Sequence, residues 1–266
     1  MRWLDGRAKI MPAIGWPSIQ ADAIRDELVA TGVHVQKYQI DVVAFREYSA
    51  VAPYPASYRE TFGPLFPEKA LEHWLSLVLL GGEMVDGMDV ASCTSPFADI
   101  VQAHTGRPIY RQDLAYPSAI SGWTIGGSAD ALPLPDRSLG AMTLHCAFEH
   151  FEGGTDTGLI HETARVLRPG GRLCILPLYL ADVFANITDP TGGFGEPTWD
   201  IGAAPHEVVG WNNRFGRWYD VSRLHERVLL PARRFFEIVV YDVVGATHVD
   251  PLCYLRFALV LQRRSG

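Results

Sequence analysis

Apolar positions along the chain follow two periods, one typical of strands and one typical of helices. Short apolar runs bounded by turn-forming residues lie at 84–90, 108–113, 139–145 and 172–177, with another short run before residue 128. Residues 155–167 instead place Leu159, Ile160 and Ala164 on one helical face, and Pro169-Gly170-Gly171 ends that pattern. Strands alternating with helices of this length predict an α/β fold with a doubly wound, mostly parallel sheet and right-handed crossovers.

Elements are also expected before and after this alternating region. Residues 67–80 predict a helix, because Pro67 suits a first turn and Leu71, Trp74, Leu75 and Val78 form an apolar stripe. Residues 18–31 predict another helix, and the β-branched residues of 34–45 favour an extended segment. We therefore expect a mostly helical N-terminal cap over residues 1–66, packed on a core over residues 67–266. Residues 235–244 and 253–262 read as two final strands.

The stretch that begins at Asp89 has the pattern of a strand, a tight loop and a helix N-terminus. The loop consists of small residues, and Pro96 then suits the first turn of a helix. Such a loop presents backbone N–H groups to a polar ligand, and its short side chains allow close approach. Asp113 ends the next predicted strand, 24 residues after Asp89. An acid at this place in doubly wound folds accepts hydrogen bonds from ribose hydroxyls.

The order and spacing of several motifs resemble the class I S-adenosylmethionine-dependent methyltransferases over residues 70–266. The matching segments are Asp89-Val-Ala-Ser-Cys-Thr-Ser, Asp113, Ala129-Asp-Ala-Leu-Pro-Leu-Pro-Asp136, Phe148-Glu-His-Phe151 and Glu162-Thr-Ala-Arg-Val-Leu-Arg-Pro-Gly-Gly-Arg172. The resemblance implies a Rossmann-like sheet of about seven strands that ends in an antiparallel pair. It also implies S-adenosyl-L-methionine as the cofactor and methyl transfer as the reaction.

The resemblance assigns cofactor-binding roles to residues at the strand ends. Asp89 and the loop of Ala91, Ser92, Cys93 and Thr94 are expected at the methionine end, and Asp113 at the ribose. Asp130 with Ala131 is expected at the adenine edge, and His145 lines the pocket through its backbone. The family usually has three glycines in the first loop, where this chain has Ala91, Cys93 and Ser95. Because a Cβ disfavours positive φ, we expect this loop to be built without left-handed residues.

Residues 186–220 differ from a scaffold segment. They are rich in turn formers, and their second half concentrates aromatic, amide and guanidinium groups. Loops of this length are often lids, so we expect a lid that also binds the acceptor. The expected acceptor-binding residues are Trp211, Asn212, Asn213, Arg214 and Tyr219. Their chemistry suits a small polar acceptor, such as a hydroxyl of a sugar or natural product; the alternative is that the aromatics only anchor the loop.

A hydroxyl nucleophile is helped by a base within hydrogen-bond reach. His150 and Glu149, just after the fourth strand, are the candidates for this catalytic role, although Glu149 can equally cap a helix or pair with an arginine. The spacing of His145, Glu149 and His150 does not match His-Glu-x-x-His or its inverse, so no metal site is predicted.

Composition limits the partners. The formal charge is −7 and no Lys/Arg run is present, which argues against nucleic acid as an obligatory partner. The longest apolar run, residues 75–80, is too short to span a membrane, and the start of the chain is charged too early for a signal peptide. We therefore expect a cytoplasmic enzyme with a small-molecule substrate, and the composition leaves its oligomeric state open.

Two other functions remain compatible with the predicted fold. A nicotinamide-dependent oxidoreductase would use the same sheet and the same acid, but its Gly-x-Gly-x-x-Gly loop does not follow Asp89. A non-catalytic Rossmann-like binding module is the second alternative. Acids at three strand ends, Asp89, Asp113 and Asp130, argue against a module that has lost its ligand.

Overall fold

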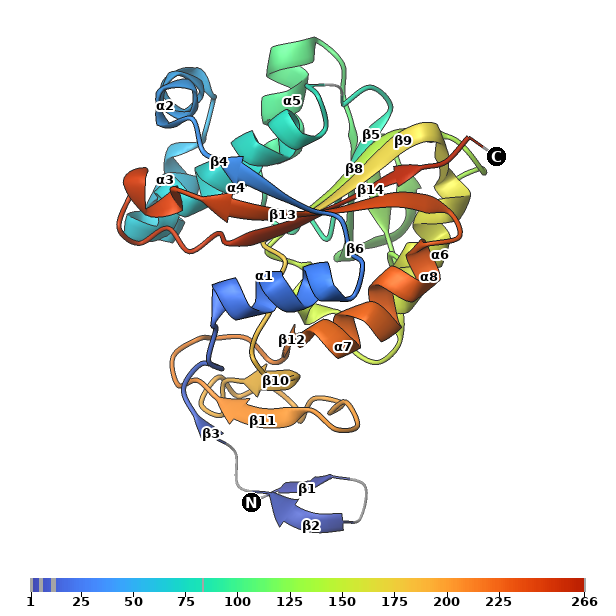
Figure 1. Ribbon diagram of the computed structural model, residues 1–266. Helices are drawn as coiled ribbons and strands as arrows, with labels where there is room; N and C mark the ends of the chain where they lie inside the picture. Colours follow the sequence, from blue (N-terminus) through green and yellow to red (C-terminus); the bar gives the residue numbers. More distant parts are fainter. Residues whose placement is uncertain (1, 5–6, 11–12, 83, 266) are drawn as a thin grey trace.

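A central sheet of eight strands runs through the molecule (Figure 1). The computed structural model describes residues 2–4, 7–10, 13–82 and 84–265. The strand order is β4-β13-β14-β9-β8-β5-β6-β7. Their bounds are β4 Val35–Gln39, β5 Gly87–Val90, β6 Tyr110–Ser121, β7 Thr124–Gly126, β8 Leu139–His145, β9 Leu167–Leu176, β13 Phe236–Val244 and β14 Phe257–Arg263. Only β14 runs antiparallel to its neighbours, β13 and β9, which confirms the predicted mostly parallel sheet with an antiparallel pair.

Helices cover both faces of the sheet. They are α1 Ala21–Ala30, α2 Val42–Val51, α3 Ala56–Phe62, α4 Phe66–Leu79, α5 Phe97–Thr105, α6 Thr155–Val166, α7 Val221–Leu224 and α8 Leu230–Ala232. Short helical turns lie at η1 Gly63–Leu65, η2 Phe148–His150, η3 His225–Leu229 and η4 Ala246–His248. One apolar core packs α2 to α5 on one face, and a second packs α1, α6 and α7 on the other (Figure 1). None of the described helices has the length and apolar character needed to cross a bilayer.

The N-terminal segment contributes a strand to the central sheet. β4 pairs in parallel with β13, so the sheet has one strand more than the expected seven. The expectation of an extended segment over 34–45 was wrong beyond Gln39. The Asp41 carboxylate caps α2 by accepting 3.0 Å hydrogen bonds from the backbone N–H groups of Val43 and Ala44, which outweighs the β-preference of the valines. The division at residue 66 stays a prediction, and residues 1, 5, 6, 11 and 12 lie outside the described part.

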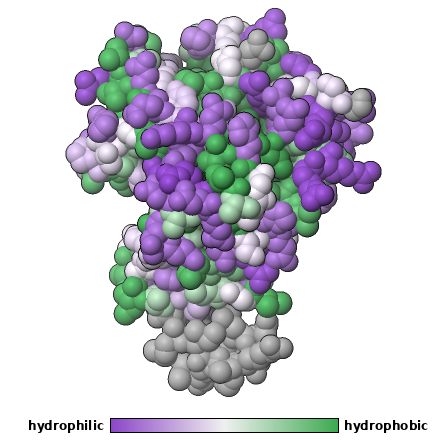
Figure 2. Space-filling view, in the orientation of Figure 1, coloured by the Kyte–Doolittle hydropathy of each residue, from purple (hydrophilic) through white to green (hydrophobic). Residues whose placement is uncertain are grey.

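The segment over 186–220, predicted as a lid, contains three strands. β10 Ala185–Thr188, β11 Ala204–Glu207 and β12 Gly216–Trp218 join β3 Ala13–Ile14 in a second sheet, of order β12-β10-β11-β3. This small sheet lies below the main body, beside the hairpin of β1 Arg2–Leu4 and β2 Arg7–Ile10 (Figure 1). Exposed apolar side chains on and beside it, including Ile14, Ile201 and Val209, interrupt the polar surface (Figure 2).

A buried arginine attaches this small sheet to the core. Arg217 of β12 is fully buried, and its guanidinium forms two hydrogen bonds, of 2.6 and 2.8 Å, to the Asp200 carboxylate. It also donates to the carbonyl oxygens of Phe151 (2.6 Å) and Gly153 (3.0 Å), and lies 3.1 Å from the carboxylate of Asp156 on α6. Because these four partners belong to three segments, one side chain cross-links the insertion, the turn after β8 and the start of α6.

We expect the Arg217→Met variant to lose about 3–5 kcal/mol of unfolding free energy, because it leaves the buried Asp200 carboxylate without its counter-charge. Urea denaturation followed by circular dichroism gives this value. Arg168→Ala is the matched control: it breaks an exposed pair with Asp86, whose two side chains are 44% and 55% exposed, and should cost less than about 1 kcal/mol. Equal losses in the two variants would contradict the structural role given to Arg217.

Candidate functional site

A cavity of about 780 Å³ opens at the carboxyl ends of β5, β6 and β8. Ligands bind at this edge in open α/β sheets, since the loops that follow the strands converge there. One part of its wall comes from the loops after these strands: Ala91, Ser92, Cys93, Thr94, Ser95, Asp113, Leu114, Ser128, Ala129, His145, Cys146 and Ala147. A second part comes from α3, α4, the turn after β8 and the insertion: Tyr58, Phe62, Lys69, Glu72, His73, Glu149, His150, Phe151, Glu152, Trp211 and Asn213. Tyr179 and Tyr254 complete this part.

The loop after β5 adopts left-handed backbone at two non-glycine residues. Ala91 has φ 51° and Cys93 has φ 45°, so the expectation of a loop without left-handed residues was wrong. The conformation is held by hydrogen bonds to the next strand: the Ala91 N–H donates to Oε1 of Gln112 (3.1 Å) and the Cys93 N–H donates to Oδ2 of Asp113 (2.8 Å). These bonds outweigh a steric cost of about 1–2 kcal/mol per residue.

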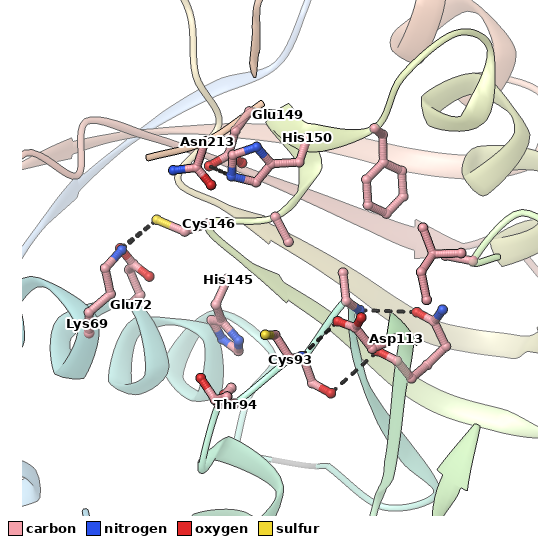
Figure 3. Close-up of a pocket in the computed structure, with 18 of the residues that line it drawn as sticks. Lys69, Glu72, Cys93, Thr94, Asp113, His145, Cys146, Glu149, His150 and Asn213 are labelled. Carbon is pink, nitrogen blue, oxygen red and sulfur yellow. Dashed lines mark hydrogen bonds and ion pairs between the residues drawn. The ribbon is translucent and has the colours of Figure 1, made fainter. Parts of the chain in front are cut away.

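Asp113 therefore organises the loop as well as facing the cavity. Its Oδ2 accepts the Cys93 N–H, and its Oδ1 accepts the backbone N–H of Ala115 at 2.8 Å. Figure 3 shows Asp113 directed at the loop, next to Cys93. A carboxylate has about four lone-pair sites, so each oxygen can accept a further bond from a ligand hydroxyl. The Tyr116 hydroxyl closes the loop by donating to the Cys93 carbonyl at 2.6 Å.

Asp89 and His145 form a buried pair at the base of the cavity. Oδ1 of Asp89 lies 3.1 Å from Nδ1 of His145, and the Thr143 hydroxyl donates to the same oxygen at 3.2 Å. Nε2 of His145 is 2.9 Å from the Ser76 hydroxyl. Because both ring nitrogens have protein partners, His145 lines the cavity as a fixed wall and has no free nitrogen for proton transfer.

The expected adenine-edge residues lie beside the cavity lining. Ser128 and Ala129 line it, whereas Asp130 and Ala131 do not. The half-buried Asp130 packs closely against Gly158 of α6: a Cβ added to Gly158 would lie 2.8 Å from the Cβ of Asp130. The loop after β7 therefore lines the cavity as expected, but through Ser128 and Ala129 instead of Asp130 and Ala131.

Glu149 and His150 lie together on the turn after β8. Nδ1 of His150 is 2.6 Å from the Phe215 carbonyl, so Nδ1 carries the ring proton and Nε2 is free to accept one. That Nε2 lies 3.6 Å from Oε1 of Glu149, and Trp211 stacks on the ring with 5.6 Å between centroids. Burial raises the pKa of Glu149, an effect that the nearby His150 partly offsets. The pair can accept and hold a proton at the cavity wall.

Two of the five residues expected to bind the acceptor reach the cavity, Trp211 and Asn213. Arg214 instead pairs with Glu152 at 2.6 Å, and Asn212 donates its backbone N–H to Asp189. Tyr219 is buried in the core, with its hydroxyl donating to Asp156 at 2.8 Å. An aromatic residue in a polar segment can therefore belong to the core. Tyr219 does, whereas Trp211 lines the cavity.

The polar face of α4 was missed by sequence reasoning. Glu68, Lys69, Glu72, His73 and Ser76 repeat at helical spacing opposite the apolar stripe, and all are buried. Such a face usually points to solvent. The one signal in the sequence was that acidic, basic and imidazole side chains lie together on this helix, which directly precedes β5.

Lys69 is the centre of this face. Its ammonium donates to Oε1 of Glu72 (2.8 Å), to Sγ of Cys146 (2.7 Å) and to the Tyr254 hydroxyl (2.9 Å), as Figure 3 shows in part. Burial by itself lowers the pKa of Lys69, but the charge of Glu72 and the Cys146 sulfur raise it above its ordinary value. Burial raises the pKa of the Cys146 thiol, so that sulfur stays protonated. Among the described residues, no group of three or more His, Cys, Asp or Glu side chains is arranged to hold a metal ion.

The left-handed loop yields a stability prediction. We expect the Cys93→Gly variant to gain about 0.5–1 kcal/mol of unfolding free energy, because glycine removes the steric cost at φ 45° while the exposed thiol contributes little packing. Cys93→Val should lose stability, since a β-branched residue is a poor fit at positive φ. Urea denaturation of both variants measures the difference. A less stable Cys93→Gly would mean that the loop is not strained.

Comparison with known proteins gives one matching family model and several solved structures of similar fold. Residues 89–175 match the family model of a methyltransferase domain. No curated protein matches the chain. Among solved structures it is similar to the PH0226 protein of Pyrococcus horikoshii OT3, with 18% identity, TM-score 0.45, and coverage of 82% of this chain and 99% of that one.

A second similar structure is 1,6-didemethyltoxoflavin-N1-methyltransferase of Burkholderia thailandensis, with 12% identity, TM-score 0.46, and coverage of 84% and 89%. A third is an S-adenosylmethionine-dependent methyltransferase of Mesorhizobium loti, with 17% identity, TM-score 0.44, and coverage of 70% and 96%. Identities this low carry no information about the acceptor. The family match itself begins at Asp89, includes the loop that Asp113 holds and reaches into β9, and it agrees with the motif order along the chain. The match shows a methyltransferase domain over residues 89–175, and with the motif order it supports a class I S-adenosylmethionine-dependent methyltransferase with S-adenosyl-L-methionine as cofactor.

Proposed function

We propose that this enzyme methylates a hydroxyl group of a small polar acceptor, such as a sugar or a natural product. The observation that carries the proposal is the orientation of His150. Its Nδ1–H donates to the Phe215 carbonyl, which leaves Nε2 as a proton acceptor on the cavity wall. A hydroxyl has to lose its proton when it is methylated, and a base within reach favours that step.

The described residues fit the cofactor. We assign the ribose hydroxyls to Asp113, whose two carboxylate oxygens each accept only one backbone N–H. The loop of Ala91 to Thr94, with Asp89 at its start, borders the methionine end, and its short side chains leave the backbone accessible. The segment from Ser128 to Ala131 borders the adenine edge, with Ser128 and Ala129 on the cavity wall.

S-adenosyl-L-methionine supplies an electrophilic methyl group bound to a sulfonium. The protein's main contribution is to hold the acceptor oxygen in line with that group, because in-line displacement depends on orientation. Nε2 of His150 takes the hydroxyl proton, and the Glu149 carboxylate, 3.6 Å away, stabilises the resulting imidazolium. The stacked Trp211 ring keeps the imidazole plane fixed while this happens.

The acceptor would lie between the turn after β8 and the insertion. Trp211 offers a ring face for stacking, and Asn213 offers amide groups for hydrogen bonds to a polar ligand. We further propose that residues 186–220 act as a lid over this part of the cavity, on a core over 67–266 with an N-terminal cap over 1–66. Arg214 supports the lid through its pair with Glu152, at the edge of the cavity.

The cofactor assignment predicts that Asp113→Ala binds S-adenosylhomocysteine about tenfold to a hundredfold more weakly, because two hydroxyls lose their acceptor and the loop loses its anchor. Calorimetric titration measures this affinity. Asp136→Asn, an exposed acid away from the cavity lining, is the control and should bind normally. Unchanged binding by Asp113→Ala would refute the ribose assignment.

The acceptor proposal is tested by methyl transfer from labelled S-adenosylmethionine to sugars, phenols, amines, proteins and RNA. We expect incorporation into small hydroxyl compounds, with the methyl group on oxygen in the product spectrum. His150→Ala should then lower kcat by about a hundredfold or more while S-adenosylhomocysteine affinity stays within about twofold, as expected for a general base. Incorporation only into RNA or protein would overturn the proposal.

A further inference from the structure

The hydrogen-bond capacity of Lys69 is fully used inside the protein. An ammonium has three N–H donors, and those of Lys69 go to Glu72, Cys146 and Tyr254 at 2.7–2.9 Å. Lys69 therefore lines the cavity without offering a free donor to a ligand. An anionic ligand group would have to displace one of these partners in order to reach it.

Two carboxylate oxygens of the same wall have the opposite property. Oε2 of Glu72 and Oε2 of Glu149 have no hydrogen-bond partner among the described residues. Both side chains belong to the cavity lining, and the two residues are only 0% and 4% exposed. A buried carboxylate oxygen without a donor costs free energy, and an ionised oxygen can only accept hydrogen bonds. Both oxygens thus lack a donor, although their side chains belong to the cavity lining.

The charges around these two oxygens do not cancel. Glu72 is neutralised by Lys69 at 2.8 Å, and Glu152 by Arg214 at 2.6 Å. Among the described residues, the one ion-pair partner of Glu149 is His150, at 3.6 Å, and its tautomer leaves Nε2 without a proton. Burial raises the pKa of Glu149 and so disfavours its ionised form. A ligand with one positive charge would oppose this effect and balance the Glu149 carboxylate.

The remaining wall also suits a cation. The cavity lining also includes the aromatic rings of Tyr58, Phe62, Tyr179, Tyr254 and Trp211. Aromatic faces attract ammonium groups, more strongly where water is excluded. Lys69 itself lies 5.4 Å from the centre of the Tyr254 ring, which is this kind of contact within the protein.

We propose that the acceptor carries a protonated amine, which donates hydrogen bonds to the free oxygens of Glu72 and Glu149. The substrate class is then a hydroxyl compound with an aliphatic ammonium group, such as an amino sugar or a phenolic amine. This inference rests on the proposed function, because it describes the acceptor of the same site. The ammonium lies toward α4, and the hydroxyl lies at Nε2 of His150.

The test uses matched pairs of ligands that differ in their charge. Glucosamine is compared with glucose, and tyramine with 4-(2-hydroxyethyl)phenol, on the full-length enzyme saturated with S-adenosylhomocysteine. We expect the amine of at least one pair to bind roughly tenfold to a hundredfold more tightly in calorimetric titrations, as charge-assisted bonds allow. If no amine is preferred over its neutral partner, including the case in which no amine binds, the proposal is overturned.

Variants then identify the groups responsible. Glu149→Gln keeps the shape of the side chain, and should reduce amine affinity to that of the neutral partner without changing S-adenosylhomocysteine affinity. Glu60→Gln is the matched control: it removes one acid from α3, the helix that carries Tyr58 and Phe62, but lies outside the cavity lining. A full amine preference in Glu149→Gln would overturn the assignment of Glu149.

Oε2 of Glu72 has a second candidate donor, the ammonium of the cofactor's own methionyl group. If Glu72→Gln weakens S-adenosylhomocysteine binding but keeps the amine preference, Glu72 serves the cofactor and its part of the proposal is refuted. Product analysis separates this inference from the proposed function. Amine-bearing acceptors methylated on nitrogen would refute hydroxyl transfer and leave amine recognition standing, whereas oxygen methylation without amine preference would do the reverse.

Discussion

The buried pairing of Arg217 with Asp200 and Asp156 is the interaction on which the cavity wall beside the insertion depends. Taking a guanidinium out of water is costly, and here five hydrogen bonds and ion pairs from three segments compensate for it. Phe215 comes just before β12, so its carbonyl is placed by the same anchor. That carbonyl holds the proton of His150 at Nδ1 and thereby leaves Nε2 as a hydrogen-bond acceptor.

The cofactor side depends on a different constraint, the contact between two neighbouring strands. Backbone N–H groups of the loop after β5 donate to Gln112 and Asp113 at the end of β6, and this forces Ala91 and Cys93 into left-handed backbone. Strained backbone of this kind persists where the surroundings over-determine it, often at ligand sites. The loop therefore adopts left-handed backbone without glycine, at the cost of local strain.

Buried polar groups concentrate between these two sides. The polar face of α4 supplies Lys69, Glu72 and His73, and Cys146 follows directly after β8, next to the paired His145. Burial lowers the pKa of His73, so this imidazole stays neutral next to His145 and the Lys69 charge. His73 therefore adds no charge to the wall, whose acceptors include carboxylate oxygens and Nε2 of His150.

The sequence by itself determined the α/β fold, the mostly parallel sheet, the helix of α4 and the match to a methyltransferase domain. These features follow from local periodicity, turn formers and motif order, which act over a few residues at a time. It also located the cavity-lining residues Asp113, His150, Trp211 and Asn213, because they adjoin strand ends or interrupt the apolar pattern.

Only the tertiary structure decided which polar side chains are buried and what they touch. Periodicity separates an apolar face from a polar one, but it does not say that Lys69 and Glu72 of the polar face meet Cys146, which lies 77 and 74 residues away. It likewise placed Tyr219 in the core, Arg214 in an ion pair and β4 in the central sheet. Contacts between distant segments depend on the packing of the whole chain, so no local pattern records them.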